Sequence, residues 1–338
     1  MSNDRVNYLN IALMMLSAIA AFILPFEVFL FAYVVLGPLH YLTEISWLHE
    51  RGYFLSGKRD HLPLVVLCVL LLALSFSHYP PERKSQITTI VNYTAFGGAA
   101  VLLMTLSNVR RAIAFALIVF SFLLTGHSAL CGIFFGVFLS TIVHVLIFTG
   151  AFILLGALRG RSRSAIASLL VLVLCAMSFF FYVPASNRQA SSYIMQAYAP
   201  FESLNLNIIR VFDLMPIGSR DALYRSPEAL AVMRFIAFAY LYHYLNWFSK
   251  TSIIKWNRIS HPRALAIIAL WLLAVGLYAS GSRTGSTLVV SLSFLHGFLE
   301  LPLNHRTFVN IGRELRAVID ERLGASASGA PSMVGNPP

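Results

Sequence analysis

The chain has 338 residues, of which 58% are hydrophobic and only 12% are charged. Soluble domains are about 25% charged, so this composition excludes a soluble globular protein and places the chain in a lipid bilayer. The formal net charge is +11. Its basic residues lie in short runs between apolar segments, the pattern that orients membrane proteins, and we therefore expect no nucleic-acid partner.

The apolar segments predict an all-α fold, a polytopic integral membrane bundle of about ten transmembrane helices. A membrane-spanning helix needs about 20 apolar residues. A long polar loop, residues 184–226, follows the seventh segment. The sixth is long enough to tilt or to contain a break, and Gly37-Pro38 marks a point where the second could break. The predicted spans are residues 8–24, 26–49, 61–77, 87–106, 112–124, 129–158, 165–183, 227–248, 264–278 and 284–303.

The distribution of positive charge predicts the orientation. If the N-terminus is cytoplasmic and the spans alternate, most of the 25 Lys and Arg residues fall in cytoplasmic segments, as the positive-inside rule requires. We therefore predict that both termini are cytoplasmic and that the protein lies in a bacterial inner (plasma) membrane. Residues 1–303 would form one transmembrane domain. Residues 304–338 would be a basic cytoplasmic tail, with an amphipathic surface helix to residue 322 and disorder from about residue 324.

Two pairs of ionisable residues with the same spacing lie inside predicted spans. His40 precedes Glu44 by four residues, and His296 precedes Glu300 by four residues. On a helix, side chains at this spacing share one face. Ionisable groups at membrane depth are costly to bury, so each pair indicates a functional site.

Two further histidines belong to the same hypothesis. In the predicted topology His40, His243 and His296 lie roughly 10–14 Å from the cytoplasmic boundary, and His144 lies deeper, near the middle of its span. If these helix faces converge, the side chains share one polar pocket. The predicted metal ligands are His40, Glu44, His144, His243, His296 and Glu300.

This donor set indicates iron. Neutral imidazole suits iron, zinc, copper and nickel, and mixed histidine–carboxylate sites with open positions are typical of non-haem iron. Helical bundles also build di-metal centres from such residues. We expect an iron or di-iron centre, with another transition metal left open, and we expect Asn246 and Tyr244 to orient the ligands. The alternative for each histidine is a hydrogen-bonded structural residue or a member of a proton relay.

With many spans and scattered intramembrane histidines, the chain is similar in kind to polytopic His-rich membrane oxygenases. Examples are the bacterial membrane carotene dioxygenases and the fatty-acid desaturase and hydroxylase group. The resemblance implies an oxidoreductase that acts on a lipid, isoprenoid or carotenoid, although the closely spaced histidine boxes of desaturases are absent. The segment Ile-Ile-Lys-Trp-Asn-Arg at 253–258, followed by His296, loosely resembles membrane-bound O-acyltransferases.

Three functions therefore remain open. The leading hypothesis is a membrane metalloenzyme that receives an apolar substrate from the bilayer and electrons from an unknown donor. The second is a proton- or cation-coupled transporter that uses the same residues as a relay. The third is an acyl- or glycosyl-transferase with His296 as general base. Metal binding requires the four histidines to converge within about 5 Å of one point, because ligand bonds are about 2 Å long.

Overall fold

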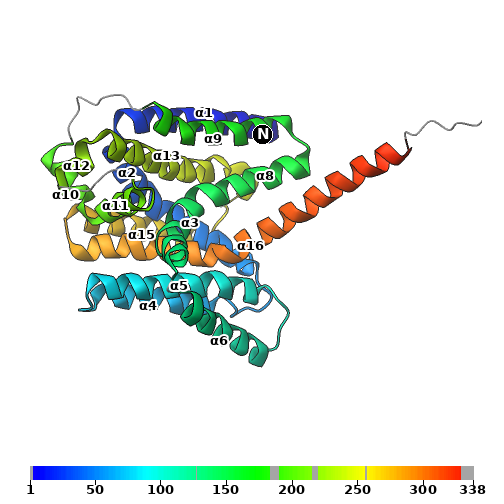
Figure 1. Cartoon of the computed structure of the whole chain (residues 1–338), viewed down its shortest axis with the longest axis horizontal. Coiled ribbons are helices and arrows are strands. Elements are labelled where there is room, and N and C mark those ends of the chain that lie inside the picture. The colour runs from blue at the N-terminus through cyan, green and yellow to red at the C-terminus, as the bar shows by residue number, and fades with distance from the viewer. Residues whose placement is uncertain (1–2, 127, 183–189, 215–219, 256, 329–338) are drawn as a thin grey trace, which may run out of the picture.

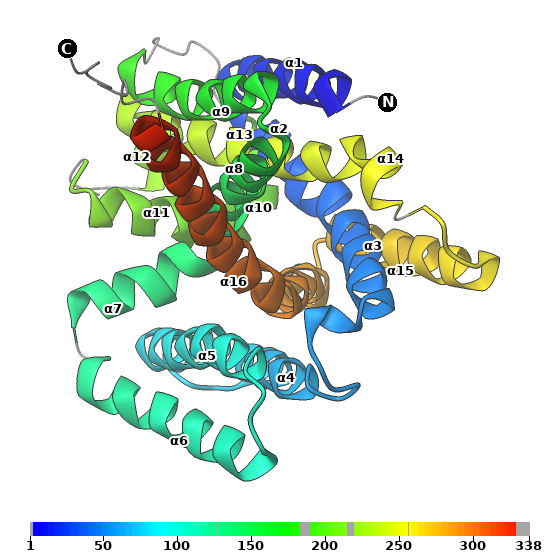
Figure 2. The ribbon, with the colours of Figure 1, turned by 90° about the vertical axis from the view of Figure 1, so that its right-hand side faces the viewer.

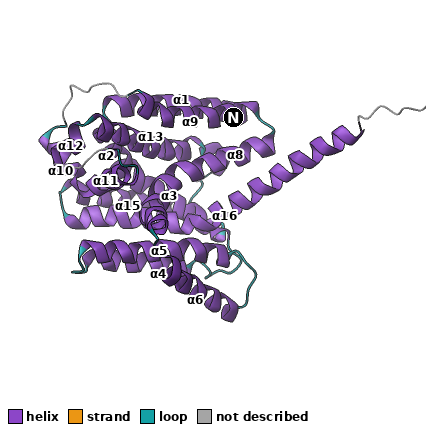
Figure 3. Ribbon diagram, viewed as in Figure 1, coloured by secondary structure: helices purple, strands orange, loops and turns teal. Residues whose placement is uncertain are grey.

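The computed structural model describes residues 3–126, 128–182, 190–214, 220–255 and 257–328. Across these ranges the chain is almost entirely helical and contains no strand (Figure 3). The all-α prediction is therefore confirmed.

Several of these helices have the length and composition of membrane spans. Within the described ranges, seven helices are long and apolar enough to cross a membrane, and Leu62–Phe76 is a shorter apolar helix. These helices indicate an integral membrane protein. Each of the ten predicted segments is largely helical, and the helix ends lie within a few residues of most predicted ends.

The helices follow one another with short connections through most of the chain. Their bounds are α1 Asn3–Ile23, α2 Pro25–Leu30, η1 Phe31–Leu36, α3 Gly37–Glu50, η2 Gly52–Phe54, α4 Leu62–Phe76, α5 Pro81–Leu102, α6 Asn108–Thr125, α7 Ala129–Ile133, η3 Phe134–Phe148, α8 Thr149–Gly160, α9 Arg163–Phe181, α10 Ser192–Tyr198, η4 Ala199–Phe201, α11 Glu202–Val211, α12 Arg220–Arg225, α13 Pro227–Ser249, α14 Thr251–Ile254, α15 His261–Ala279 and α16 Arg283–Ser328.

The bundle is arranged in three layers, which Figures 1 and 2 show from two directions. Helices α1, α9 and α13 pack on one another in the first layer, and α4, α5 and α6 form the third. The middle layer contains α3, α15 and α16, and α16 contacts both α4 and α5. Helix α16 therefore joins the middle layer to the third.

Helix α13 is the most enclosed helix of the bundle. Its N-terminus is fixed by Pro227 in the first turn and by Ser226, whose hydroxyl accepts a hydrogen bond from the Ala229 N–H at 3.3 Å. From Ala229 to Tyr244 every residue is buried, against α1, α2, α9 and η3 among others. A helix that is apolar on nearly every face is stable only when surrounded in this way.

Two segments are π-helical, η1 and η3. The first ends at Leu36, and Pro38 lies in the first turn of α3, which begins at Gly37. Because proline has no N–H to donate to the preceding turn, the ladder of hydrogen bonds changes register at this point. The break predicted at Gly37-Pro38 is therefore a change of helix type within a continuous span. The long sixth segment likewise contains η3, and α8 continues it obliquely (Figure 1).

The C-terminal part of the chain differs from the prediction. The tenth span and the basic tail are one helix, α16, which continues through Pro302 to Ser328, beyond the predicted start of disorder. Ion pairs from Arg159 to Glu314 and from Arg161 to Glu321 hold this extension against the end of α8. Residues 329–338 lie outside the described ranges.

The predicted polar loop is also helical in its described parts. Between Ser192 and Arg225 it forms α10, η4, α11 and α12. It is amphipathic: Tyr198, Phe201 and Ile208 are buried, and they pack in the main core with α2 and α13. These apolar residues explain why the segment folds onto the bundle.

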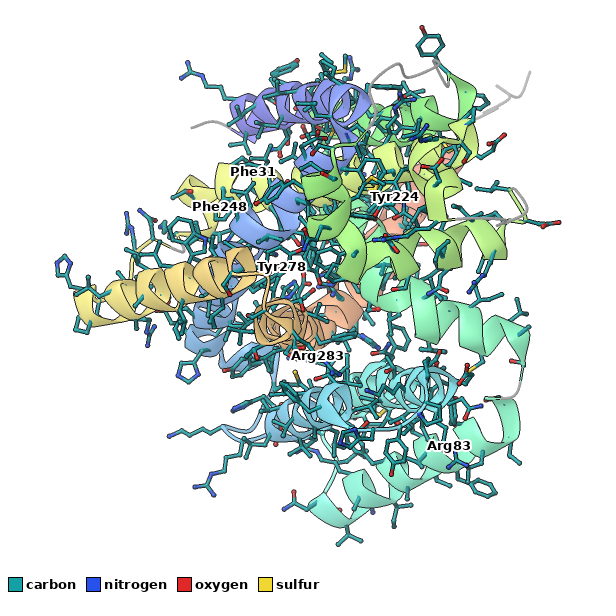
Figure 4. All side chains as sticks on the ribbon, turned by 90° about the vertical axis from the view of Figure 1, so that its left-hand side faces the viewer. Phe31, Arg83, Tyr224, Phe248, Tyr278 and Arg283 are labelled. Atoms are coloured by element: carbon teal, nitrogen blue, oxygen red, sulfur yellow. The ribbon has the colours of Figure 1, made fainter. Side chains whose placement is uncertain are left out.

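The start of α1 and the end of α16 point to the same side of the bundle (Figure 1). The opposite end faces the viewer in Figure 4, where Arg83 and Arg283 are labelled. They stand near the beginnings of α5 and α16.

Candidate metal centre

Four buried imidazoles from four helical segments meet in the middle of the bundle. His40 comes from α3, His144 from η3, His243 from α13 and His296 from α16, and each is at most 8% exposed. The Nε2 atoms of His144 and His296 are 2.8 Å apart, and those of His40 and His243 are 3.2 Å apart. Ring centroids of His40 and His296 are 5.2 Å apart, and those of His144 and His243 are 5.3 Å apart. We call these residues the histidine cluster.

The hydroxyl of Thr149 determines the tautomer of His243. Thr149 Oγ1 donates its one hydrogen to the Val145 carbonyl at 2.9 Å. It therefore accepts from the Nδ1–H of His243, also at 2.9 Å. A neutral imidazole has only one N–H, so His243 Nε2 presents a lone pair to the cluster.

Both predicted carboxylates contact the cluster. Glu44 Oε2 lies 3.1 Å from His40 Nε2, and Glu300 Oε2 lies 3.5 Å from His144 Nδ1. Glu44 is 2% exposed and Glu300 is 4% exposed. Among the described residues these histidines are the only ion-pair partners of the two carboxylates, so no Lys or Arg compensates their charge at contact distance.

The donor geometry fits a metal ion. Two nitrogens bound to one ion at about 2.0–2.1 Å, with angles between about 90° and 110°, lie about 2.9–3.4 Å apart. The two close Nε2 pairs have separations near this range. One ligand atom from each of His40, His243 and His296 also lies within 4.8 Å of the others. The Nε2–H of His40 can donate to only one of two acceptors, His243 Nε2 and Glu44, whereas a cation would be bound by all of them.

The sequence predicted that His144 lies deeper than the other three histidines, but in the structure it lies beside them. It is in hydrogen-bond contact with His296. The estimate assumed straight α-helices normal to the membrane, but His144 lies in the long π-helix η3, and α8 continues it obliquely (Figure 1).

Aromatic side chains enclose the cluster. The Tyr41 ring stacks on His296 with centroids 4.2 Å apart, and its hydroxyl is 2.5 Å from that of Tyr244. A Cβ at Gly37 would lie 2.9 Å from the Tyr41 hydroxyl, so glycine leaves the space for this ring. Trp247 packs on His40 and donates its indole N–H to Thr43. Trp247 is buried in the protein interior.

The two residues expected to orient ligands have different environments. Tyr244 packs against the His40 ring at 5.1 Å and bonds to Tyr41. Asn246 is buried, but its Oδ1 has no hydrogen-bond partner. The residue that bonds to His243 is Thr149. The sequence signal for it was weak, because a threonine in an apolar helix usually bonds to its own backbone.

Two cavities meet at His144. The first, about 440 Å³, is lined by Glu44, Glu300, Asn246 and Lys250 together with three cluster histidines; we call it the carboxylate cavity. The second, about 240 Å³, lies on another side of His144; we call it the aromatic cavity. Its aromatic wall includes Phe29, Tyr33, Phe201, Tyr240, Phe294 and Phe298.

The segment that resembles O-acyltransferases lies apart from the cluster. Within it, Ile254 accepts a hydrogen bond from the Trp47 indole through its carbonyl and lines the carboxylate cavity. Asn257 and Arg258 are not among the cavity-lining residues described above, and Trp256 lies outside the described ranges. This segment therefore contributes a wall residue and no described side chain that reaches His296.

Comparisons of the chain with protein-family models, with curated proteins and with solved structures find no match.

Proposed function

We propose that this chain is an integral membrane metalloenzyme, a non-haem iron oxidoreductase of the oxygenase, hydroxylase or desaturase type. The observation that carries the proposal is the histidine cluster, in which four buried imidazoles and two carboxylates from four segments face one another. Six donors exceed what one ion needs when coordination positions stay open for reactants, which supports a di-iron centre.

The chain's own residues would hold the metal and exclude water. The bond to Thr149 orients His243 so that its Nε2 lone pair faces the cluster. The Tyr41 ring covers His296, and the Trp247 ring covers His40. Iron with open positions supplies one-electron and O₂ chemistry that side chains lack. The substrate would be an apolar lipid, isoprenoid or carotenoid that enters from the bilayer, and an unidentified donor would supply electrons.

We also propose the orientation predicted from the positive charge. Ten spans with both termini in the cytoplasm of a bacterium would put the basic ends of α3, α8 and α16 on the inner side of its plasma membrane. The positions of the start of α1 and the end of α16 on one side of the bundle support an even number of crossings.

The two alternatives receive less support. A transport relay needs ionisable groups on both sides of the cluster. The aromatic cavity has neutral polar side chains such as Ser140, Asn207 and Ser293, but its described lining residues include no carboxylate, lysine or arginine. Glu27, the main acidic residue of the far half, lines a separate surface groove. A transferase with His296 as general base predicts one essential histidine, whereas His296 touches His144 and lies against His40.

The metal content of purified protein tests the proposal. Wild-type protein expressed with sufficient iron should contain iron at one or two ions per chain by elemental analysis. The double variant His40→Ala/His296→Ala should contain none. A matched control, His61→Ala/His305→Ala, removes two histidines that pack on Tyr53 and Phe96 away from the cluster and should keep its iron.

Wild-type protein without a stoichiometric metal would refute the proposal, and so would a double variant that keeps its metal. Zinc or copper at full occupancy in place of iron would retain the metal site and refute the iron assignment.

A further inference from the structure

We propose that the aromatic cavity binds the chain of an unsaturated isoprenoid that carries a hydroxyl group, with part of the chain against His144. Its role as substrate rests on the proposed function, but its binding does not. The proposal specifies which cavity holds the organic ligand and what chemistry that ligand has.

The position of the cavity is the first argument. His144 lines both cavities, so a ligand in the aromatic cavity lies beside the histidine cluster. Gly297 also lines it, and a Cβ there would lie 3.6 Å from His144 Cε1. The glycine therefore leaves one edge of the His144 imidazole uncovered on the cavity side.

The walls are the second argument. Rings from α2, η1, η4, α13 and α16 form part of the cavity wall, beside neutral polar side chains such as Ser140. Several rings meet edge to face: Phe29 lies 5.3 Å from both Phe201 and Tyr240. Flat π-faces and ring edges interact favourably with other π systems beyond the area they bury. A chain of isolated or conjugated double bonds uses this property, and a saturated acyl chain does not.

An unpaired polar atom is the third argument. Asn92 on α5 is fully buried at 0% exposure and lines the aromatic cavity. Its amide donates to the Phe135 carbonyl at 2.7 Å, but its Oδ1 has no partner. A buried acceptor without a donor costs about 1–3 kcal/mol. A ligand hydroxyl would satisfy it, and an unfunctionalised hydrocarbon would not.

The backbone around the cavity is the fourth argument. Both π-helices of the described chain border it, η1 through Tyr33 and η3 through several residues including Ser140 and His144. π-Helical turns are rare and concentrate at functional sites. Two of them at one cavity indicate that its shape is a built feature of the fold.

Photolabelling tests the site without any activity measurement. The probe is geranylgeraniol with a diazirine in its chain, applied to purified protein in detergent and mapped by mass spectrometry. In the wild type we expect labels on peptides that contain Tyr33, Phe201 or Phe294. Ser140→Trp fills the cavity and should abolish them. Ile142→Trp, two residues away on η3 but in an outward-facing apolar groove, should retain them.

Competition and a second variant define the ligand class. Unlabelled geranylgeraniol should suppress labelling at lower concentration than stearyl alcohol, which lacks double bonds, or squalene, which lacks a hydroxyl. Asn92→Leu should weaken competition by geranylgeraniol about tenfold, the value of one hydrogen bond, and leave competition by squalene unchanged.

Labels confined to the outward-facing groove, or labels that Ser140→Trp leaves intact, would overturn the site. Equal competition by stearyl alcohol or squalene would overturn the ligand class. Iron analysis of the same samples separates the two proposals. Labelled protein without metal refutes the metalloenzyme alone, and iron-loaded protein without cavity labels refutes this inference alone.

Discussion

The two cavities that meet at His144 differ in their chemistry. The carboxylate cavity contains Glu44, Glu300, Asn246 and Lys250 in a wall that is otherwise mostly apolar and aromatic. It shares Asn246 and Lys250 with a larger polar cavity of about 710 Å³ beside the starts of α1 and α9. The described lining residues of the aromatic cavity include no carboxylate, lysine or arginine, and its polar side chains other than His144 are neutral, among them Asn92, Ser140 and Asn207. The cluster therefore lies between a cavity with charged groups and a cavity with only neutral polar groups and apolar rings.

This asymmetry separates two tasks that a membrane oxidoreductase must combine. Asn246 and Lys250 line both the polar cavity and the carboxylate cavity. The ligand proposed above would occupy the aromatic cavity, whose described lining includes neither Glu44 nor Glu300. Asn246 therefore lines both the polar and the carboxylate cavity, which accounts for a buried amide that does not bond to His243.

The largest expected effect comes from the two carboxylates. If the carboxylate cavity belongs to the metal centre, Glu44→Gln/Glu300→Gln should lower iron affinity by at least about a hundredfold, because it replaces two anionic donors with neutral ones of the same shape. Competition with a chromophoric chelator measures this. The control Glu50→Gln/Glu321→Gln neutralises two surface ion pairs and should leave affinity unchanged. Equal affinity in the first variant would show that the metal site lies on the histidines alone.

A smaller effect is expected from the hydroxyl that orients His243. Thr149→Val leaves the Nδ1–H of His243 without an acceptor and frees the ring to change tautomer, so iron affinity should fall about 10–100-fold. Thr149→Ser keeps the hydroxyl and should restore most of the affinity. The same chelator competition measures both variants. If valine and serine give the same affinity, Thr149 acts only through packing.

The tyrosine pair that packs on the histidine cluster should affect stability more than metal binding. Tyr41→Phe leaves the buried Tyr244 hydroxyl unpaired at a cost of about 1–3 kcal/mol, and thermal unfolding in detergent should shift down accordingly. The double variant Tyr41→Phe/Tyr244→Phe removes both hydroxyls and should be less destabilised than the sum of the single variants. Additive effects would show that the two hydroxyls do not act as a pair, and a loss of iron would place Tyr41 in the metal site.

The sequence predicted the positions of the apolar helices well because apolar length is a property of each segment alone. The four-residue spacing also identified the histidine–carboxylate pairs as candidates for one site. His40 contacts Glu44 as this spacing predicts, whereas Glu300 contacts His144 of another segment. The cost of burying ionisable residues inside apolar segments can be inferred from the sequence alone, without knowledge of any tertiary contact.

Features that depend on two segments at once could not be predicted. The depth of His144 depends on η3 being π-helical and on the oblique course of α8, and nothing local in an apolar run distinguishes a π-helix from an α-helix. The bond from Thr149 to His243 joins residues 94 positions apart. The basic tail after residue 303 suggested that the tenth span ends there, but α16 continues through Pro302 and packs against α8.

The smallest expected effect concerns Lys250, which lines both the carboxylate and the polar cavity. Burial lowers the pKa of Lys250 to about 8, below its usual value of about 10.4. The folded protein therefore bears the full cost of the buried ammonium below pH 8 and loses that cost as the pH rises toward 10. Lys250→Met should raise the melting temperature by a few degrees at pH 7, and the gain should vanish near pH 10. The exposed Lys58→Met should show neither effect. A gain that is equal at both pH values would come from packing and would show that Lys250 does not titrate in this pH range.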